Sequence, residues 1–196
     1  LFRQTCGYPY ATRLSGKVQL LATPCYAVEG CEGPTYSSAI IVRRDSDVVS
    51  LEGALKGKLA YNSVDSLSGY RCFVPLIGDP VSMFSASQKS GGHRQSAIMV
   101  ANGEADCAAI DAVCWDMFQR YEPECASRLR VLTWGPRFPA LPYITRLGWD
   151  EPDLEKLKYA LREAVATMKV EPLCAPLYPA RLGTVDIAAY EGLSEL

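Results

Sequence analysis

Short apolar runs rich in β-branched residues alternate with amphipathic stretches along most of this chain. Strands are predicted at residues 18–23, 37–43, 58–61 and 106–111, with a weaker one at 82–87. Helices are predicted at residues 113–120 and 154–168, the last with Asp150 as its N-cap, and a short helix or turn is predicted at residues 51–57. A further helix is predicted after the Gly-rich turn Ser90–His93, with Gly103 as its C-cap. Such alternation predicts an α/β fold, and taken alone it favours mainly parallel sheets.

Length and charge narrow the function classes. The 196 residues allow one large domain or two small lobes. The net charge is −2 and no long basic run occurs, which argues against a nucleic-acid partner. No apolar run reaches the ~20 residues of a membrane span, and Leu1–Gln4 does not begin a signal-peptide pattern. A globular protein without a membrane span is therefore predicted.

Cysteine and histidine usage argues against a metal centre or a cofactor. The chain has eight cysteines but no CxxC pair, so a zinc ribbon or thioredoxin-type motif is not supported. Their even number leaves disulfides open, although Cys107 in its apolar strand is better explained as a buried free thiol. His93 is the only histidine, which excludes a multi-histidine metal site. We predict neither metal nor cofactor.

A strand, a polar or Gly-rich turn and a helix follow one another twice, at Ser66–Gly69 and at Ser90–His93. The first turn of a helix offers unpaired N–H groups and a partial positive charge, and such turns lie where open α/β sheets bind ligands. Each turn also has a plain structural explanation. A serine before a helix is most often only a cap, and a lone histidine is most often not a ligand contact. The two turns together predict an anion site.

Four segments, considered together, resemble the phosphonate/phosphite/phosphate family of ABC-transporter solute-binding proteins. These are YSS followed by IIVRRDS, then LEGALKGKLAYNSVDSLSGY, SGGHRQSAIMVANGEADCAAID and PALPYIT. The resemblance covers about residues 4–168. It implies an α/β type II periplasmic-binding fold with two lobes, mixed sheets and a two-strand hinge.

The lobes implied are residues 1–43 with 143–196, and residues 44–142. The hinge is then expected near residues 37–43 and 143–146. Family members carry a further β–α–β stretch before the segment that matches QTCGYPY. We therefore expect the first lobe to be truncated at its N-terminus relative to theirs.

The resemblance also implies a set of ligand-binding residues. The SxSG turn would bind the oxygens of the anion, and His93 would add a donor from the second turn. Gly92 stands where the family usually has a serine, which removes one hydroxyl and leaves the identity of the ligand open. The full set is Tyr8, Tyr36, Ser66, Leu67, Ser68, Gly69, His93 and Asp111.

Asp111 allows two interpretations. It ends an apolar strand, and its carboxylate either emerges at the cleft or caps the following helix through Val113 or Cys114. At the cleft it would repel an anion unless the ligand brought an ammonium group or a protonated oxygen. Asp111 would then discriminate against sulfate.

The function implied is capture of a small phosphonate- or phosphate-like anion in a periplasmic cleft, for delivery to ABC permease subunits. The effector-binding domain of a transcription regulator is an alternative with the same fold. An enzyme using Cys6, His93 and Asp111 is a further one, although no local signature supports such a triad. We therefore predict a non-enzymatic binding protein.

Overall fold

The computed structural model describes residues 2–167 and 179–196. The chain forms two compact units: unit 1 holds residues 1–36 and 138–196, and unit 2 holds residues 37–137. Both units combine helices with sheets, so the fold class is α/β.

Unit 2 is built on a five-stranded mixed sheet with the order β7-β6-β8-β5-β9. β6 runs parallel to both β7 and β8, whereas β5 pairs antiparallel with β8 and β9. The strands are β5 (Ser38–Arg43), β6 (Lys58–Tyr61), β7 (Ala86–Lys89), β8 (Cys107–Asp111) and β9 (Leu129–Trp134). Because β6 and β8 are parallel neighbours, the segments that follow them leave the sheet at the same edge.

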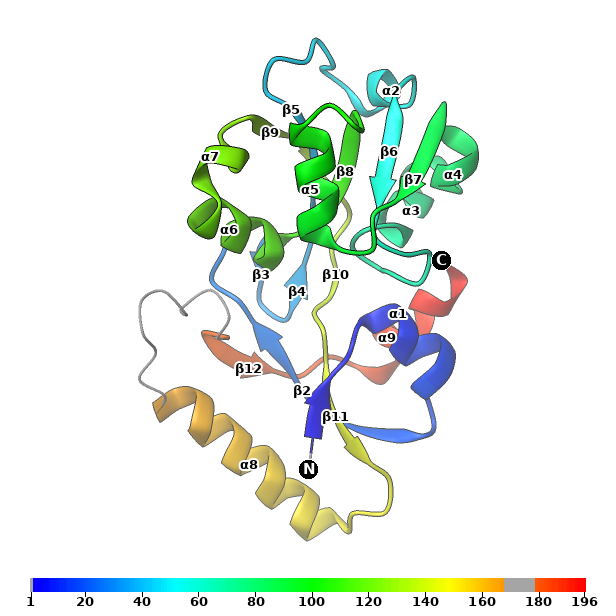
Figure 1. Cartoon of the computed structure of the whole chain (residues 1–196). Coiled ribbons are helices and arrows are strands. Elements are labelled where there is room, and N and C mark those ends of the chain that lie inside the picture. Colours follow the sequence, from blue (N-terminus) through cyan, green and yellow to red (C-terminus); the bar gives the residue numbers. More distant parts are fainter. Residues whose placement is uncertain (1, 168–178) are drawn as a thin grey trace. The chain divides into compact units, whose positions relative to one another are not determined.

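Two helices of unit 2 matter most for the site. α5 (His93–Ala101) packs against β8, β5 and β6, and α6 (Ala112–Tyr121) follows β8 directly (Figure 1). Both contribute to the core, α5 through Ala97 and Val100 and α6 through Trp115 and Phe118. The shorter helices are α2 (Leu51–Ala54), η2 (Arg71–Phe73), α3 (Val74–Ile77), α4 (Pro80–Met83) and α7 (Pro123–Ala126).

Unit 1 contains two antiparallel sheets, with the orders β1-β11-β2-β12 and β10-β4-β3. The first consists of β1 (Phe2–Gln4), β11 (Tyr143–Arg146), β2 (Val18–Cys25) and β12 (Arg181–Gly183). The second consists of β10 (Phe138–Pro139), β4 (Thr35–Tyr36) and β3 (Cys31–Glu32).

The long helix of unit 1 is α8 (Glu151–Thr167), which packs on β2 and β12 through Leu154 and Leu161 (Figure 1). The predicted cap is confirmed, because Asp150 Oδ1 accepts from the backbone N–H of Asp153 at 2.9 Å. Met168, the last residue of the predicted helix, lies outside the described residues. The other helical segments are α1 (Gly7–Pro9), η1 (Tyr10–Leu14), α9 (Ile187–Glu191) and η4 (Gly192–Glu195).

The boundaries of the units differ from those predicted for the lobes. β5, assigned to the first lobe, belongs to unit 2 because it hydrogen-bonds on both edges, to β8 and to β9. The predicted hinge segments are likewise interior strands, since β11 lies between β1 and β2. The chain passes between the units at Tyr36–Ser37 and Arg137–Phe138, where Tyr36 pairs with Phe138. Bending at these two connections stays a prediction.

Two local predictions were wrong. The sheets are not mainly parallel, because unit 1 pairs strands from distant parts of the sequence rather than strands joined by successive crossovers. The strand predicted at 82–87 begins only at Ala86, because Asp79 caps α4 by accepting from the N–H of Ser82 and Pro80 occupies its first turn.

Five of the cysteines that the structure describes are free thiols, namely Cys25, Cys72, Cys107, Cys114 and Cys125. Over residues 2–167 and 179–196, no helix combines the length and apolarity needed to cross a membrane.

Candidate anion-binding site

The serine loop, residues 62–70, leaves the sheet at the end of β6 and turns at once into η2. Ser66 Oγ accepts from the backbone N–H of Gly69 at 3.0 Å, and the Ser66 carbonyl accepts from Arg71 N–H at 2.9 Å. These bonds are those of a serine that caps a short helical turn. The loop therefore has one defined conformation at the edge where the strands end.

A glycine is required at position 69 because a side chain would not fit there, and not because of its backbone angles. A Cβ built on it would overlap the side chain of Asn62, the first residue after β6. Asn62 Oδ1 in turn accepts from the N–H of Ser63 at 2.8 Å, so the side chain is held in place. The glycine of the SxSG turn thus allows the two ends of the serine loop to touch.

Leu67 is the middle residue of the Ser66–Ser68 turn, and its contact with a ligand stays a prediction. It is fully buried, so its side chain anchors the serine loop in the core. Its carbonyl accepts from Cys72 N–H at 2.8 Å, and this bond continues the helical turn. We therefore assign Leu67 to positioning the loop.

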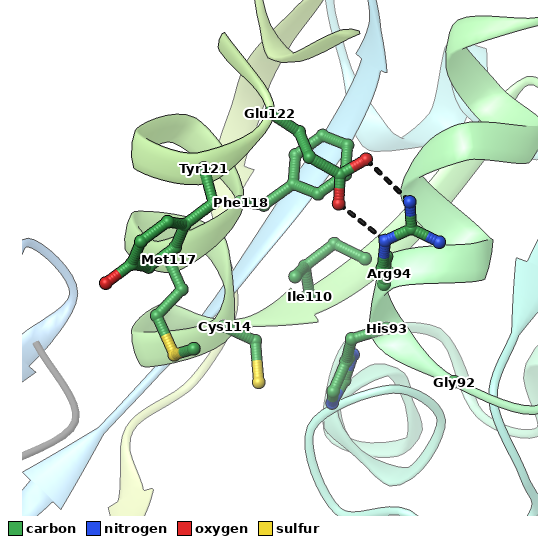
Figure 2. Close-up of a pocket in the computed structure, with 9 residues that line it drawn as sticks. All are labelled: Gly92, His93, Arg94, Ile110, Cys114, Met117, Phe118, Tyr121 and Glu122. Carbon is green, nitrogen blue, oxygen red and sulfur yellow. Dashed lines mark hydrogen bonds and ion pairs between the residues drawn. The ribbon is translucent and has the colours of Figure 1, made fainter. Parts of the chain in front are cut away.

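His93 joins the serine loop to α5. It is the first residue of the nine-residue helix, after Gly92 as N-cap, and Figure 2 shows its ring beside the thiol of Cys114. His93 Nε2 lies 3.0 Å from Ser68 Oγ and 3.3 Å from Asn62 Nδ2. The chain segments predicted as two turns of one site do meet, at these atoms.

The hydrogen-bond partners indicate which tautomer His93 adopts. Asn62 Nδ2 is only a donor, so Nε2 must accept from it, and the proton is then carried by Nδ1. Nδ1 is buried and has no hydrogen-bond partner in the part of the chain that the structure describes, although the backbone of Ala109 on β8 lies near the ring. Burial lowers the pKa of His93, while the nearby Asp111 carboxylate opposes that shift. The imidazole is therefore neutral at pH 7 in the free protein.

Asp111 is the last residue of β8 and the N-cap of α6. Its Oδ1 accepts from the N–H of Val113 at 2.9 Å and of Cys114 at 3.2 Å, and the residue is only 6% exposed. Burial raises the pKa of its carboxyl group, and His93 counters that rise. These two bonds confirm the helix cap, whereas a contact between the carboxylate and a ligand stays a prediction.

Tyr8 and Tyr36 belong to unit 1. Tyr8 lies half-buried in α1, and Tyr36 is almost fully buried in β4, paired with Cys31 and Phe138. The predicted residues that the structure brings together are those of unit 2, namely Ser66, Ser68, Gly69, His93 and Asp111. The further helix N-terminus predicted at the serine loop is only η2 and α3, which are too short to supply much dipole.

Asn62 is the site residue that sequence reasoning missed. It contacts His93 and lies against Gly69, yet it is absent from the set of ligand-binding residues predicted above. A polar residue directly after a strand, close before an SxSG turn, was the available signal.

Two α/β units joined by two connections, with polar groups gathered where β6 and β8 end, define a solute-binding protein of the type II periplasmic-binding class. The family model for the ABC-transporter phosphonate periplasmic substrate-binding protein matches residues 4–190. The chain belongs to this family. A search of curated proteins gave no match.

Solved structures agree on the fold. A binding-protein component of an ABC phosphonate transporter from Pseudomonas aeruginosa is 22% identical, with a TM-score of 0.73; the match covers 96% of this chain and 65% of that one. A Xanthomonas citri protein solved with chloride is 19% identical, with a TM-score of 0.75 and coverage of 99% and 75%. PhnD1 from Prochlorococcus marinus, in complex with methylphosphonate, is 17% identical, with a TM-score of 0.67 and coverage of 89% and 70%. This chain thus spans less than two thirds of the Pseudomonas protein.

Proposed function

We propose that this chain captures a small phosphonate- or phosphate-like oxyanion for an ABC transporter, with the serine loop and His93 as the anion site. The observation that carries the proposal is the 3.0 Å approach of Ser68 Oγ to His93 Nε2, which joins the serine loop to the first turn of α5. Two hydroxyls, an imidazole and the N–H groups of a helix start then face one region.

The donors fit an oxyanion of phosphorus. Ser66 Oγ accepts from Gly69 N–H, which leaves its hydroxyl hydrogen to donate. Ser68 can turn its hydroxyl from His93 to the ligand, and a protonated His93 can then donate as well. Asp111 acts through His93, as a buried carboxylate that favours the imidazolium form.

The remaining parts of the proposal follow from family membership. We propose Tyr8 and Tyr36 of unit 1 as further ligand contacts, ABC permease subunits as partners, and the periplasm as the place of action. The family consists of transporter binding proteins, so we propose no catalytic role.

Ser68, His93 and Asp111 together invite comparison with a serine-hydrolase triad. In such a triad the carboxylate accepts a hydrogen bond from the Nδ1–H of the histidine. Here Nδ1 has no hydrogen-bond partner among the described residues, and Asp111 Oδ1 accepts from the backbone N–H groups at the start of α6. The geometry favours binding over nucleophilic catalysis.

Replacing Ser68 by alanine is expected to weaken binding of methylphosphonate about tenfold or more. A hydrogen bond to a charged group contributes ~1.5–3 kcal/mol, and each ~1.4 kcal/mol is a factor of ten. Titration calorimetry with phosphate, phosphite and methylphosphonate measures the loss.

Ser85→Ala is the matched control. Ser85 also donates its hydroxyl to a backbone carbonyl, that of Gly57, but it lies at the start of β7, the opposite end of the sheet from the serine loop. The Ser85→Ala chain should bind methylphosphonate with the affinity of the unmodified chain. Equal affinities for Ser68→Ala and Ser85→Ala would contradict the proposed site.

A further inference from the structure

Unit 2 contains an open pocket of about 400 Å³ between the N-terminus of α5 and the length of α6 (Figure 2). This volume lies within the ~300–1,000 Å³ typical of small-molecule sites. Its wall consists of apolar side chains from β8 and α6: Ile110, Cys114, Met117 and Phe118. We call it the apolar pocket.

The charges at the rim of the apolar pocket cancel each other. Arg94 and Glu122 form a bidentate pair, with Nε–Oε1 at 2.5 Å and Nη2–Oε2 at 2.9 Å (Figure 2). Both oxygens of Glu122 are occupied by the guanidinium, and Glu122 is the only acidic residue among those that line the pocket. An ammonium group placed there would find its carboxylate already paired.

The thiol in the wall is also uncharged. Burial and the neighbouring Asp111 carboxylate raise the pKa of Cys114 to about 12. At neutral pH it is a protonated thiol that packs like a small apolar group. The wall thus presents aliphatic, thioether, thiol and aromatic surface.

The apolar pocket and the anion site share a residue. His93, proposed above to hold the anion, lines one end of the pocket together with Gly92. A substituent on an anion bound at His93 therefore has the apolar pocket as its neighbour. Gly92 has no side chain to separate the two, and a Cβ there would meet no atom within 4 Å.

We infer that the apolar pocket receives the organic substituent of the ligand, so that this chain prefers a phosphorus oxyanion bearing a compact alkyl or aryl group over inorganic phosphate and over aminoalkylphosphonates. This inference rests on the proposed function of the anion site. It departs from the sequence-based expectation of an ammonium group near Asp111, because Asp111 is itself the N-cap of α6 and is only 6% exposed.

A homologous series on the unmodified chain tests the inference. Methyl-, ethyl-, propyl- and butylphosphonate should bind with rising affinity, roughly fourfold for each CH₂ that is fully buried. Propylphosphonate and 2-aminoethylphosphonate form a matched pair, since they differ by a methyl in place of an ammonium. Propylphosphonate should bind at least tenfold more tightly, as measured by competition calorimetry.

A charge placed in the wall gives a second measurement. Met117→Glu should remove most of the gain from methyl- to propylphosphonate and narrow the gap to 2-aminoethylphosphonate. Gln119→Glu adds the same charge to α6 at an exposed position and should keep the series unchanged.

The outcomes separate the two proposals. If all alkylphosphonates bind as methylphosphonate does, or if 2-aminoethylphosphonate binds best, the inference about the apolar pocket is overturned while the anion site stands. If no phosphonate, phosphite or phosphate binds, the proposed function fails and the inference fails with it.

Discussion

Replacing His93 by glutamine is expected to weaken binding of methylphosphonate at pH 6 by up to a hundredfold, and to remove a pH dependence that the unmodified chain shows. In the free protein burial lowers the pKa of His93, and its Nε2 accepts from Asn62. An anion beside the ring favours the imidazolium, so binding raises that pKa again. The charged hydrogen bond gained contributes ~1.5–3 kcal/mol.

The sign of the pH dependence follows from these two values of the His93 pKa. Affinity is highest below the pKa of the free protein, which lies under its usual 6.5. It then falls about tenfold per pH unit until the pKa of the complex is passed, because one proton is taken up on binding in that range. Affinity is thus lost as the pH rises.

Two controls separate the proton uptake of His93 from that of the ligand, because the ligand itself also titrates near neutral pH. Calorimetry in two buffers of different ionisation enthalpy counts the protons taken up, and the count for His93→Gln gives the contribution of the ligand alone. If the unmodified chain and His93→Gln take up the same number of protons, His93 does not hold the anion in its charged form.

Replacing Asp111 by alanine is expected to lower the free energy of unfolding by about 2–3 kcal/mol. Loss of an N-cap costs ~0.5–2 kcal/mol, and here the N–H groups of Val113 and Cys114 lose their acceptor at a buried position. Asp111→Asn keeps a capping oxygen and should cost about 1 kcal/mol or less. Urea unfolding followed by circular dichroism measures both.

The matched control is Asp186→Ala, which removes an exposed N-cap from α9, where only Ala188 N–H is accepted, at 3.0 Å. Its cost should stay near 0.5–1 kcal/mol. A second measurement tests the link to His93: Asp111→Asn should move the pH range of anion binding downward, because the imidazolium loses a neighbouring carboxylate. An Asp111→Ala chain no less stable than Asp186→Ala would contradict the capping role.

Most of unit 2 could be predicted from the sequence because local signals and tertiary packing agree there. β6 occurs where it was predicted, and Gly92 before His93 marks the start of α5. The cap at Asp111 was one of two interpretations of that residue, and its hydrogen bonds to Val113 and Cys114 confirm it.

The rest depended on partners distant in sequence. β5 and β11 are recognisable as strands, but which unit each belongs to is decided by strand pairing, which apolar patterning does not encode. The approach of Asn62 to His93, and the apolar pocket between α5 and α6, arise only when the helices pack. Met117 would stand at the same helical spacing whether it packed in the core or lined a pocket, so its position in the sequence does not distinguish the two.

Residues 37–137 form one continuous stretch of the chain, so unit 2 is encoded by a single uninterrupted part of the gene. Every group of the proposed anion site in unit 2, and the whole wall of the apolar pocket, comes from this one uninterrupted stretch. Its two ends leave from paired positions, because Tyr36 faces Phe138 across β4 and β10. A single recombination event exchanging that stretch would therefore exchange the proposed anion-binding groups of unit 2 together with the apolar pocket, and would leave the sheets and the long helix of unit 1 unaltered.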